Sequence, residues 1–173
     1  MSAVTLDITP DIDIAIRQFL GHEAMLLDTG RLEDWAGLLD EAILYEIPMR
    51  ISARKREDEF PAGAFRMHED MAMIQKRLER MRTNENWAED PASRTVRTVG
   101  SIFIEADEGG GVYRVHSALS LYRQRAIDRA YEWIPARRID RIRIGADGEC
   151  RLVRRTIILA ETILQTPNLA VFL

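Results

Sequence analysis

The stretch VYRVHSALSLYRQR, residues 112–125, decides the fold class because its apolar and polar side chains alternate almost one by one. One side of the extended chain carries Tyr113, Val115, Leu119 and Leu121, and the other carries Arg114, His116 and Ser120. Alternation with a period of two predicts a β-strand that has one buried face. This part of the chain therefore belongs to a sheet.

The same period continues on both sides of this stretch. Strands are predicted at residues 94–105, 137–144 and 150–164. The glycine-rich sequences DEGGG (107–111) and GADGE (145–149) predict tight hairpins between neighbouring strands. The second half of the chain is thus expected to form a long antiparallel sheet.

The first half of the chain contains helical patterns. Thr9 and Pro10 resemble an N-cap and a first helical residue, and an apolar face then recurs as far as Gly30. A shorter helix is expected at 32–40, a strand at 42–49, and a helix with one apolar stripe from Met67 to Met81. Helices first and strands later predict an α+β fold with helices on one face of the sheet, forming a single domain over residues 1–173.

Composition excludes several classes of protein. The chain has 173 residues, no apolar run of eighteen, and no basic leader at its start, so neither a membrane span nor a signal peptide is predicted. A single cysteine, Cys150, excludes an internal disulfide framework and suits the cytoplasm. The phosphate-binding, dinucleotide and nucleophile-elbow glycine motifs are absent from the sequence. One cysteine and three separated histidines cannot build a zinc site or a Rieske cluster within this chain.

Charge is unevenly distributed along the chain. Residues 1–93 hold 11 basic and 19 acidic side chains, a net −8, whereas residues 94–173 hold 13 and 9, a net +4. The arginines of the second half alternate with apolar residues, which is typical of a solvated or pairing sheet face, so no nucleic-acid partner is expected. Arginine outnumbers lysine by 22 to 2, a bias that suits protein interfaces.

Three residues are candidates for a catalytic pocket. Glu23 falls on the apolar face of the first helix, where it is either a buried general base or a partner of a sheet arginine or a tyrosine hydroxyl. His116 is the best placed histidine for a base, or else a sheet residue that bonds a neighbour. Tyr45, in the strand 42–49, could join them.

Two segments suggest packing rather than catalysis. NENWAEDPASRT (84–95) predicts a corner at which Pro91 stops a helix before a strand begins. The apolar ending RTIILAETILQTPNLAVFL (155–173) is expected to dock on its own sheet or on a partner chain. The candidate corner and interface residues are Trp87, Glu89, Asp90, Pro91, Ser93, Arg94, Arg97, Asn168 and Phe172.

These two segments, together with DWAGLLDEAILYEIPMR (34–50) and LERMRTN (78–84), carry a resemblance in the same order along nearly the whole chain. The chain resembles the small (beta) subunit of bacterial aromatic-ring-hydroxylating dioxygenases. Two local departures are visible, because Val96 intervenes before Arg97 where the family has further basic residues, and Ala160–Glu161 replaces an Asp-Gln-like pair.

The resemblance implies a cone-shaped, nuclear-transport-factor-2-like α+β fold with a curved antiparallel sheet. It implies a structural, non-catalytic subunit that assembles with a catalytic alpha subunit, as a mixed hexamer with three of each and with beta–beta contacts. The alpha subunit would carry the Rieske [2Fe–2S] cluster and the mononuclear Fe(II), with no cofactor or metal in this chain. Electrons would come from NAD(P)H, and O₂ would be added to an arene to give a cis-dihydrodiol in aromatic catabolism.

Two other functions remain open from the sequence. Cone folds also form stand-alone lyases and isomerases, which would use His116, Glu23 and Tyr45 in the cavity of the cone. A ligand-binding or scaffold homo-oligomer is the third possibility. Fold alone does not distinguish these functions.

Overall fold

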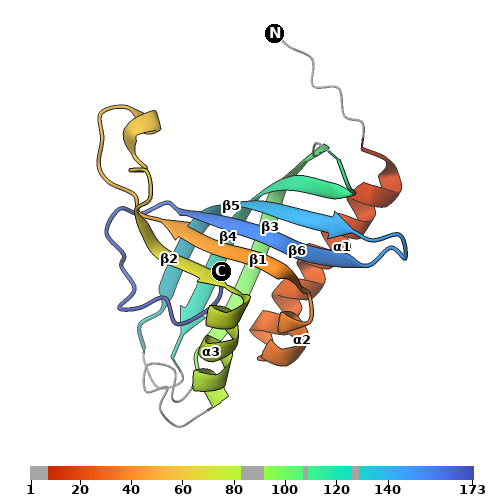
Figure 1. Cartoon of the computed structure of the whole chain (residues 1–173). Helices are drawn as coiled ribbons and strands as arrows, with labels where there is room; N and C mark the ends of the chain where they lie inside the picture. Colours follow the sequence, from red (N-terminus) through yellow and green to blue (C-terminus); the bar gives the residue numbers. More distant parts are fainter. Residues whose placement is uncertain (1–7, 83–91, 107–108, 126–128) are drawn as a thin grey trace.

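The computed structural model describes residues 8–82, 92–106, 109–125 and 129–173. Its centre is a six-stranded sheet, curved round a helix, in the order β2-β1-β6-β5-β4-β3 (Figure 1). The strands are β1 (Leu39–Pro48), β2 (Phe65–Asp70), β3 (Arg94–Ala106), β4 (Val112–Gln124), β5 (Glu132–Ile144) and β6 (Cys150–Leu159). All neighbours are antiparallel except β1 and β6, which run parallel. The α+β class with a curved, largely antiparallel sheet is confirmed.

The helices are α1 (Pro10–Asp28), α2 (Leu32–Ala36), the 3-10 turn η1 (Arg56–Asp58) and α3 (Met71–Arg82). The Thr9 side chain caps α1 as predicted, accepting a hydrogen bond from the Ile12 amide at 3.4 Å. The apolar face of α1 packs on the concave side of the sheet, chiefly on β3. There Ile16 and Leu20 join Ile142 and Ile157 of the sheet in one core. The helices therefore cover one face and leave the other uncovered by the described helices.

The predicted helix at 67–81 is wrong in its first turn. Residues 65–70 form the edge strand β2, in which Met67 pairs with Ile47 of β1. Strand β2 runs directly into the helix that begins at Met71. The apolar Met67 of the strand therefore lies four residues before Met71 and fits the helical spacing by coincidence. His68 also lies in this strand.

Other boundaries also differ from the prediction. The short helix ends at Ala36 and β1 begins at Leu39, while β6 ends at Leu159 rather than at 164. Strand β5 begins at Glu132, five residues early, and contains Pro135 although it lies between two strands. The Pro135 carbonyl accepts from the Ala160 amide, so the missing N–H faces the point where β6 has ended.

The predicted hairpins are confirmed, and one glycine in them is required by its surroundings. Gly111 has φ 72° and its carbonyl accepts from the Ile144 amide of β5. A Cβ at this position would lie 2.9 Å from the Ile144 carbonyl oxygen. Only glycine allows both the left-handed backbone and this close approach.

Candidate functional site

The segment after β6 turns back across the concave side of the sheet and ends beside β1 and α3 (Figure 1). Its Phe172 side chain is 2% exposed. The ring lies 4.2 Å from the Trp35 ring centroid and 5.9 Å from that of Tyr45, with the Arg77 guanidinium 4.1 Å above it. The apolar ending therefore packs on its own sheet, one of the two alternatives that its composition allowed.

Arg77 of α3 fastens the same segment. Its Nη2 donates to the carbonyls of Leu169 (2.8 Å) and Val171 (3.1 Å), and its Nη1 lies 3.0 Å from the Glu69 carboxylate. A planar guanidinium can make these bonds while stacking on an aromatic ring, which an ammonium cannot do as well. Sequence reasoning missed Arg77, whose side chain is only 6% exposed.

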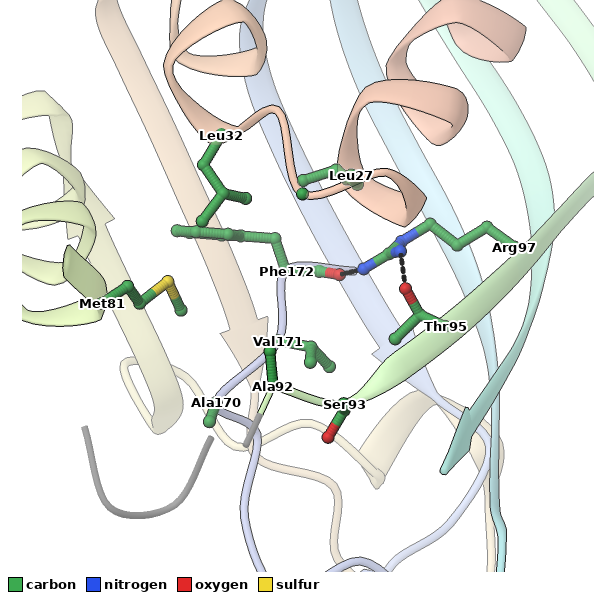
Figure 2. Close-up of a pocket in the computed structure, with 11 residues that line it drawn as sticks. Leu27, Leu32, Met81, Ala92, Ser93, Thr95, Arg97, Ala170, Val171 and Phe172 are labelled. Atoms are coloured by element: carbon green, nitrogen blue, oxygen red, sulfur yellow. Dashed lines mark hydrogen bonds between the residues drawn. The ribbon is translucent and has the colours of Figure 1, made fainter. Parts of the chain in front are cut away.

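Arg97 of β3 holds the segment from the opposite side. It donates from Nη2 to the Phe172 carbonyl at 2.6 Å (Figure 2). It also forms an ion pair with Asp28 at the end of α1. Burial lowers the pKa of Arg97, while the adjacent Asp28 carboxylate opposes that shift. The Asp28 carboxylate also accepts from the Arg97 amide at 2.7 Å and the Thr95 hydroxyl at 2.9 Å. Arg97 thus joins helix, strand and C-terminal segment.

A pocket of about 150 Å³ lies beside Arg97. Figure 2 shows it between the end of α1, α3 and the C-terminal segment. It is mainly apolar, and its lining includes Leu27, Leu32, Met81 and Phe172. The pocket brings two of the predicted corner residues, Ser93 and Arg97, close to Phe172.

At the described end of the predicted corner, Ser93 contacts Arg123 of β4, a residue that sequence reasoning missed. Its side chain is 1% exposed and contacts the hydroxyl of Ser93 (3.1 Å), the carboxylate of Glu132 (3.0 Å) and the hydroxyl of Thr166 (3.1 Å). It also donates to the carbonyl and the side-chain oxygen of Asn168 at 3.2 and 3.0 Å. In the alternation of β4, Arg123 falls on the same buried face as Leu119 and Leu121, so the sequence pattern itself indicated that Arg123 is buried.

The other predicted corner residues are placed as follows. Trp87, Glu89, Asp90 and Pro91 lie outside the described residues. Arg94 is exposed at the start of β3.

The two departures from the family pattern also have visible surroundings. Val96 is exposed, on the face of β3 that points away from the helices. The Ala160 carbonyl accepts from Arg50 at 3.1 Å, and the Glu161 carboxylate accepts from the Gln165 amide at 3.2 Å.

A cluster of buried charges lies between α1 and the sheet. Glu23, 1% exposed, receives two bonds from Arg155 of β6 at 2.6 and 2.8 Å and one from the Trp35 indole at 3.2 Å. Arg155 also donates to both carboxylate oxygens of Asp140 on β5, at 2.8 and 2.9 Å. Arg138 adds a second cation 3.6 Å from Glu23. Glu23 therefore has a sheet arginine as its partner, one of the alternatives expected for it.

These charges shift the pKa values of Glu23 and Arg155. Burial acts to raise the pKa of Glu23, but Arg155 and Arg138 outweigh it, so this pKa lies below its ordinary value. Burial acts to lower the pKa of Arg155, but Asp140 and Glu23 raise it well above its ordinary value. A general base needs a pKa near the working pH. The environment of Glu23 moves its pKa in the opposite direction.

The three pocket candidates do not meet. Tyr45 is completely buried, where its hydroxyl accepts from the Leu173 amide at 2.7 Å and donates to the Leu173 carbonyl at 3.3 Å. Burial raises its pKa. His116 lies on the opposite face of the sheet, 3.2 Å from the Glu105 carboxylate, because its neighbours Val115 and Ser117 point inward. The structure thus does not assemble a lyase or isomerase site from these residues.

The chain's thiol and imidazoles do not fit an iron site either. Cys150 begins β6, His22 lies in α1, His68 in β2 and His116 in β4. His68 contacts the Glu46 carboxylate, and His116 contacts the Glu105 carboxylate. Within the described ranges, no three His, Cys, Asp or Glu side chains gather as a metal site, and no helix is long and apolar enough to cross a membrane.

Known proteins resemble this chain in sequence and in architecture. A profile of the family described as "Ring hydroxylating beta subunit" matches residues 22–166. The chain is 38% identical over 156 residues to the N,N-dimethyl phenylurea N-demethylase subunit beta of Sphingobium sp. (strain YBL2), covering 90% of this chain and 88% of the relative. It is 30% identical to the benzene 1,2-dioxygenase subunit beta of Pseudomonas putida, covering 95% and 90%.

Among solved structures, naphthalene 1,2-dioxygenase with indole bound in its active site superposes with a TM-score of 0.79. The sequence identity is 26%, and the match covers 91% of this chain and 83% of that one. The predicted cone-shaped, nuclear-transport-factor-2-like fold is confirmed by this architecture. With the profile match over most of its length, the chain belongs to the family of ring-hydroxylating beta subunits.

Proposed function

We propose that this chain is the structural, non-catalytic beta subunit of a cytoplasmic oxygenase whose catalytic alpha subunit carries the Rieske cluster and the mononuclear Fe(II). The holoenzyme would take electrons from NAD(P)H and contain three copies of each subunit. Residues 1–173 would form one domain, since strands from both halves of the chain share one sheet.

The observation that carries this proposal is that the C-terminal segment and paired charges occupy the interior of the cone. Phe172 and Leu173 pack beside Trp35 and Tyr45, where a cone-fold enzyme would hold its substrate. The interior carboxylates of Glu23 and Asp140 are bound by Arg155. An interior in which the C-terminal segment is docked and the carboxylates of Glu23 and Asp140 are paired suits a scaffold whose function lies at its surface.

The reaction proposed for the holoenzyme adds both atoms of O₂ to an aromatic ring. An arene, O₂, NAD(P)H and a proton would give the cis-dihydrodiol and NAD(P)⁺. One relative is named for benzene dioxygenation and another for phenylurea N-demethylation. The assay should therefore include simple arenes and N-methylated phenylureas.

Co-expression with a Rieske-type alpha subunit from the same genome tests the proposal. A tag on this chain should retain the alpha subunit in equal amount, with the iron and the activity in the complex. The tagged chain alone should be colourless, iron-free and inactive. Stoichiometric iron in the chain alone, or turnover without a partner, would overturn the proposal.

A further inference from the structure

The pocket beside Arg97 has the size and the lining of a site for one small apolar molecule. Its volume is about 150 Å³, and Leu27, Leu32, Met81 and Phe172 contribute to its wall (Figure 2). Cavities of about this size that are lined by aliphatic and aromatic side chains take up benzene. A ligand of that size would remove apolar wall from water, which is favourable in proportion to the area covered.

The polar side chains in the wall of the pocket already have partners. The Thr95 hydroxyl donates to the Asp28 carboxylate and accepts from Arg97 Nη1, both at 2.9 Å. The Ser93 hydroxyl accepts from Arg123 at 3.1 Å. The Arg97 Nε has no hydrogen-bond partner within the described part of the chain, but it is buried and offers no surface to a ligand. A polar substituent would therefore lose its bonds to water and gain none from these side chains, which favours a hydrocarbon.

Three groups in the wall also favour an aromatic ring over a saturated one. Trp35 and Arg77 cover the Phe172 ring, at 4.2 and 4.1 Å from its centroid, so that the edge of this ring is left for a ligand. An aromatic edge packs well on the face of another ring. The Met81 thioether and the Arg97 guanidinium are likewise attracted to π systems. A saturated ring of the same size gains none of these contacts.

We propose that this pocket binds one single-ring aromatic hydrocarbon, of the size of benzene. The bound ring contacts Val171 and Phe172 of the C-terminal segment, whose Phe172 carbonyl is held by Arg97 at 2.6 Å. The ligand therefore adds a contact that keeps this segment docked on the sheet. The site lies within a single chain and needs no second subunit, so the inference does not rest on the proposed function.

An NMR titration of the isotopically labelled full chain tests the site. Benzene should shift the amide signals of Thr95 and Val171 in a saturable way, with a Kd on the order of 1 mM or below. Cyclohexane and phenol, added at the same concentrations, should bind at least about fivefold more weakly.

Variants of the wall locate the bound ring. Ala170→Leu places a longer side chain in the pocket and should abolish benzene binding. Ala160→Leu adds the same volume at an exposed residue of the same segment and should bind benzene like the wild type. Met81→Leu keeps the size of the side chain but removes its sulfur, and should weaken benzene binding about two- to tenfold. Thermal unfolding of each variant without ligand shows that it is folded.

The outcomes separate this inference from the proposed function. Signals that do not shift, or benzene binding that survives in Ala170→Leu, would overturn the site. Should Ala170→Leu fail to fold, Met81→Leu decides, and an unchanged affinity for benzene would count against the pocket. Cyclohexane or phenol bound as tightly as benzene would overturn the choice of ligand. A chain that binds benzene as expected but captures no alpha subunit would overturn the proposed function alone, and the reverse result would overturn this inference alone.

Discussion

At Glu23, a carboxylate on an apolar helix face meets the guanidinium groups of Arg155 and Arg138. Bringing these charges out of water costs several kcal/mol per ion, which is regained only when each has good partners. Asp140 supplies the second carboxylate, so two cations and two anions face one another between α1 and the sheet. The cluster therefore tolerates the loss of one member poorly.

Glu23→Ala is expected to lower the free energy of unfolding by about 3–5 kcal/mol, because it leaves buried arginines without their carboxylate. Urea denaturation followed by circular dichroism measures the change. The control is Glu33→Ala, which removes an exposed carboxylate paired with Arg82 and should leave the midpoint unchanged. A midpoint as high in Glu23→Ala as in the control would show that the cluster does not stabilise the fold.

The pH dependence of stability follows from the same residue. The pKa of Glu23 is lower in the folded chain than its ordinary value, so its contribution is present above the unfolded pKa of about 4.3. That contribution is lost as pH falls through the lower folded pKa. In denaturation series between about pH 5 and 3, wild type should lose stability more steeply than Glu23→Gln. Equal slopes would contradict the assignment.

Among the elements, the C-terminal segment contributes the aromatic centre of the core. Phe172→Ala removes a ring packed against Trp35, Tyr45 and Arg77, and should cost about 3–5 kcal/mol of stability. Thermal and urea unfolding measure the loss. Ile163→Ala, in the same segment but 78% exposed, is the control. A Phe172→Ala protein as stable as this control would mean that the segment only covers a core formed elsewhere.

The sequence predicts those elements whose local pattern agrees with their environment. In β4, the alternation gives the strand and its two faces, and at α1 the Thr9 cap and the apolar face agree. Local pattern fails at β2, where Met67 fits both the period of a helix and that of a strand. It also fails at β5, where Pro135 suggests that the strand begins after it. There, pairing with a neighbouring strand decides the structure.

The site is harder to predict than the fold because arginine, as a charged residue, is expected at the surface even where the alternation places it on the buried face. Alternating arginines predict a solvated or pairing sheet face, yet Arg97, Arg123, Arg138 and Arg155 point inward and are buried. Their positions in the alternation, shared with Leu121 and Ile157, carried the correct signal. Their partners, such as Asp28 and Asn168, lie 45 to 69 residues away in sequence, and local pattern does not pair them.

For the whole molecule, a substitution at Arg94 is expected to affect assembly without affecting folding. Its side chain is exposed at the start of β3, so Arg94→Ala should leave the melting temperature unchanged and reduce the amount of complex recovered with the alpha subunit. Co-purification and light scattering measure the recovery and the number of copies. Arg17→Ala, at an exposed residue of α1, is the control. Normal assembly of the Arg94 variant would remove this residue from the interface.

The parallel pairing of β1 with β6 sets the order in which the chain can fold. Tyr45 pairs with Arg155, so β1 and β2 join the sheet only through a strand that is synthesised more than a hundred residues later. Contacts between such distant residues slow folding, since a long loop must close before they stabilise anything. During translation, the apolar residues of β1 therefore lack their final neighbours until β6 has left the ribosome. Chaperone demand for this subunit should accordingly peak late in its synthesis.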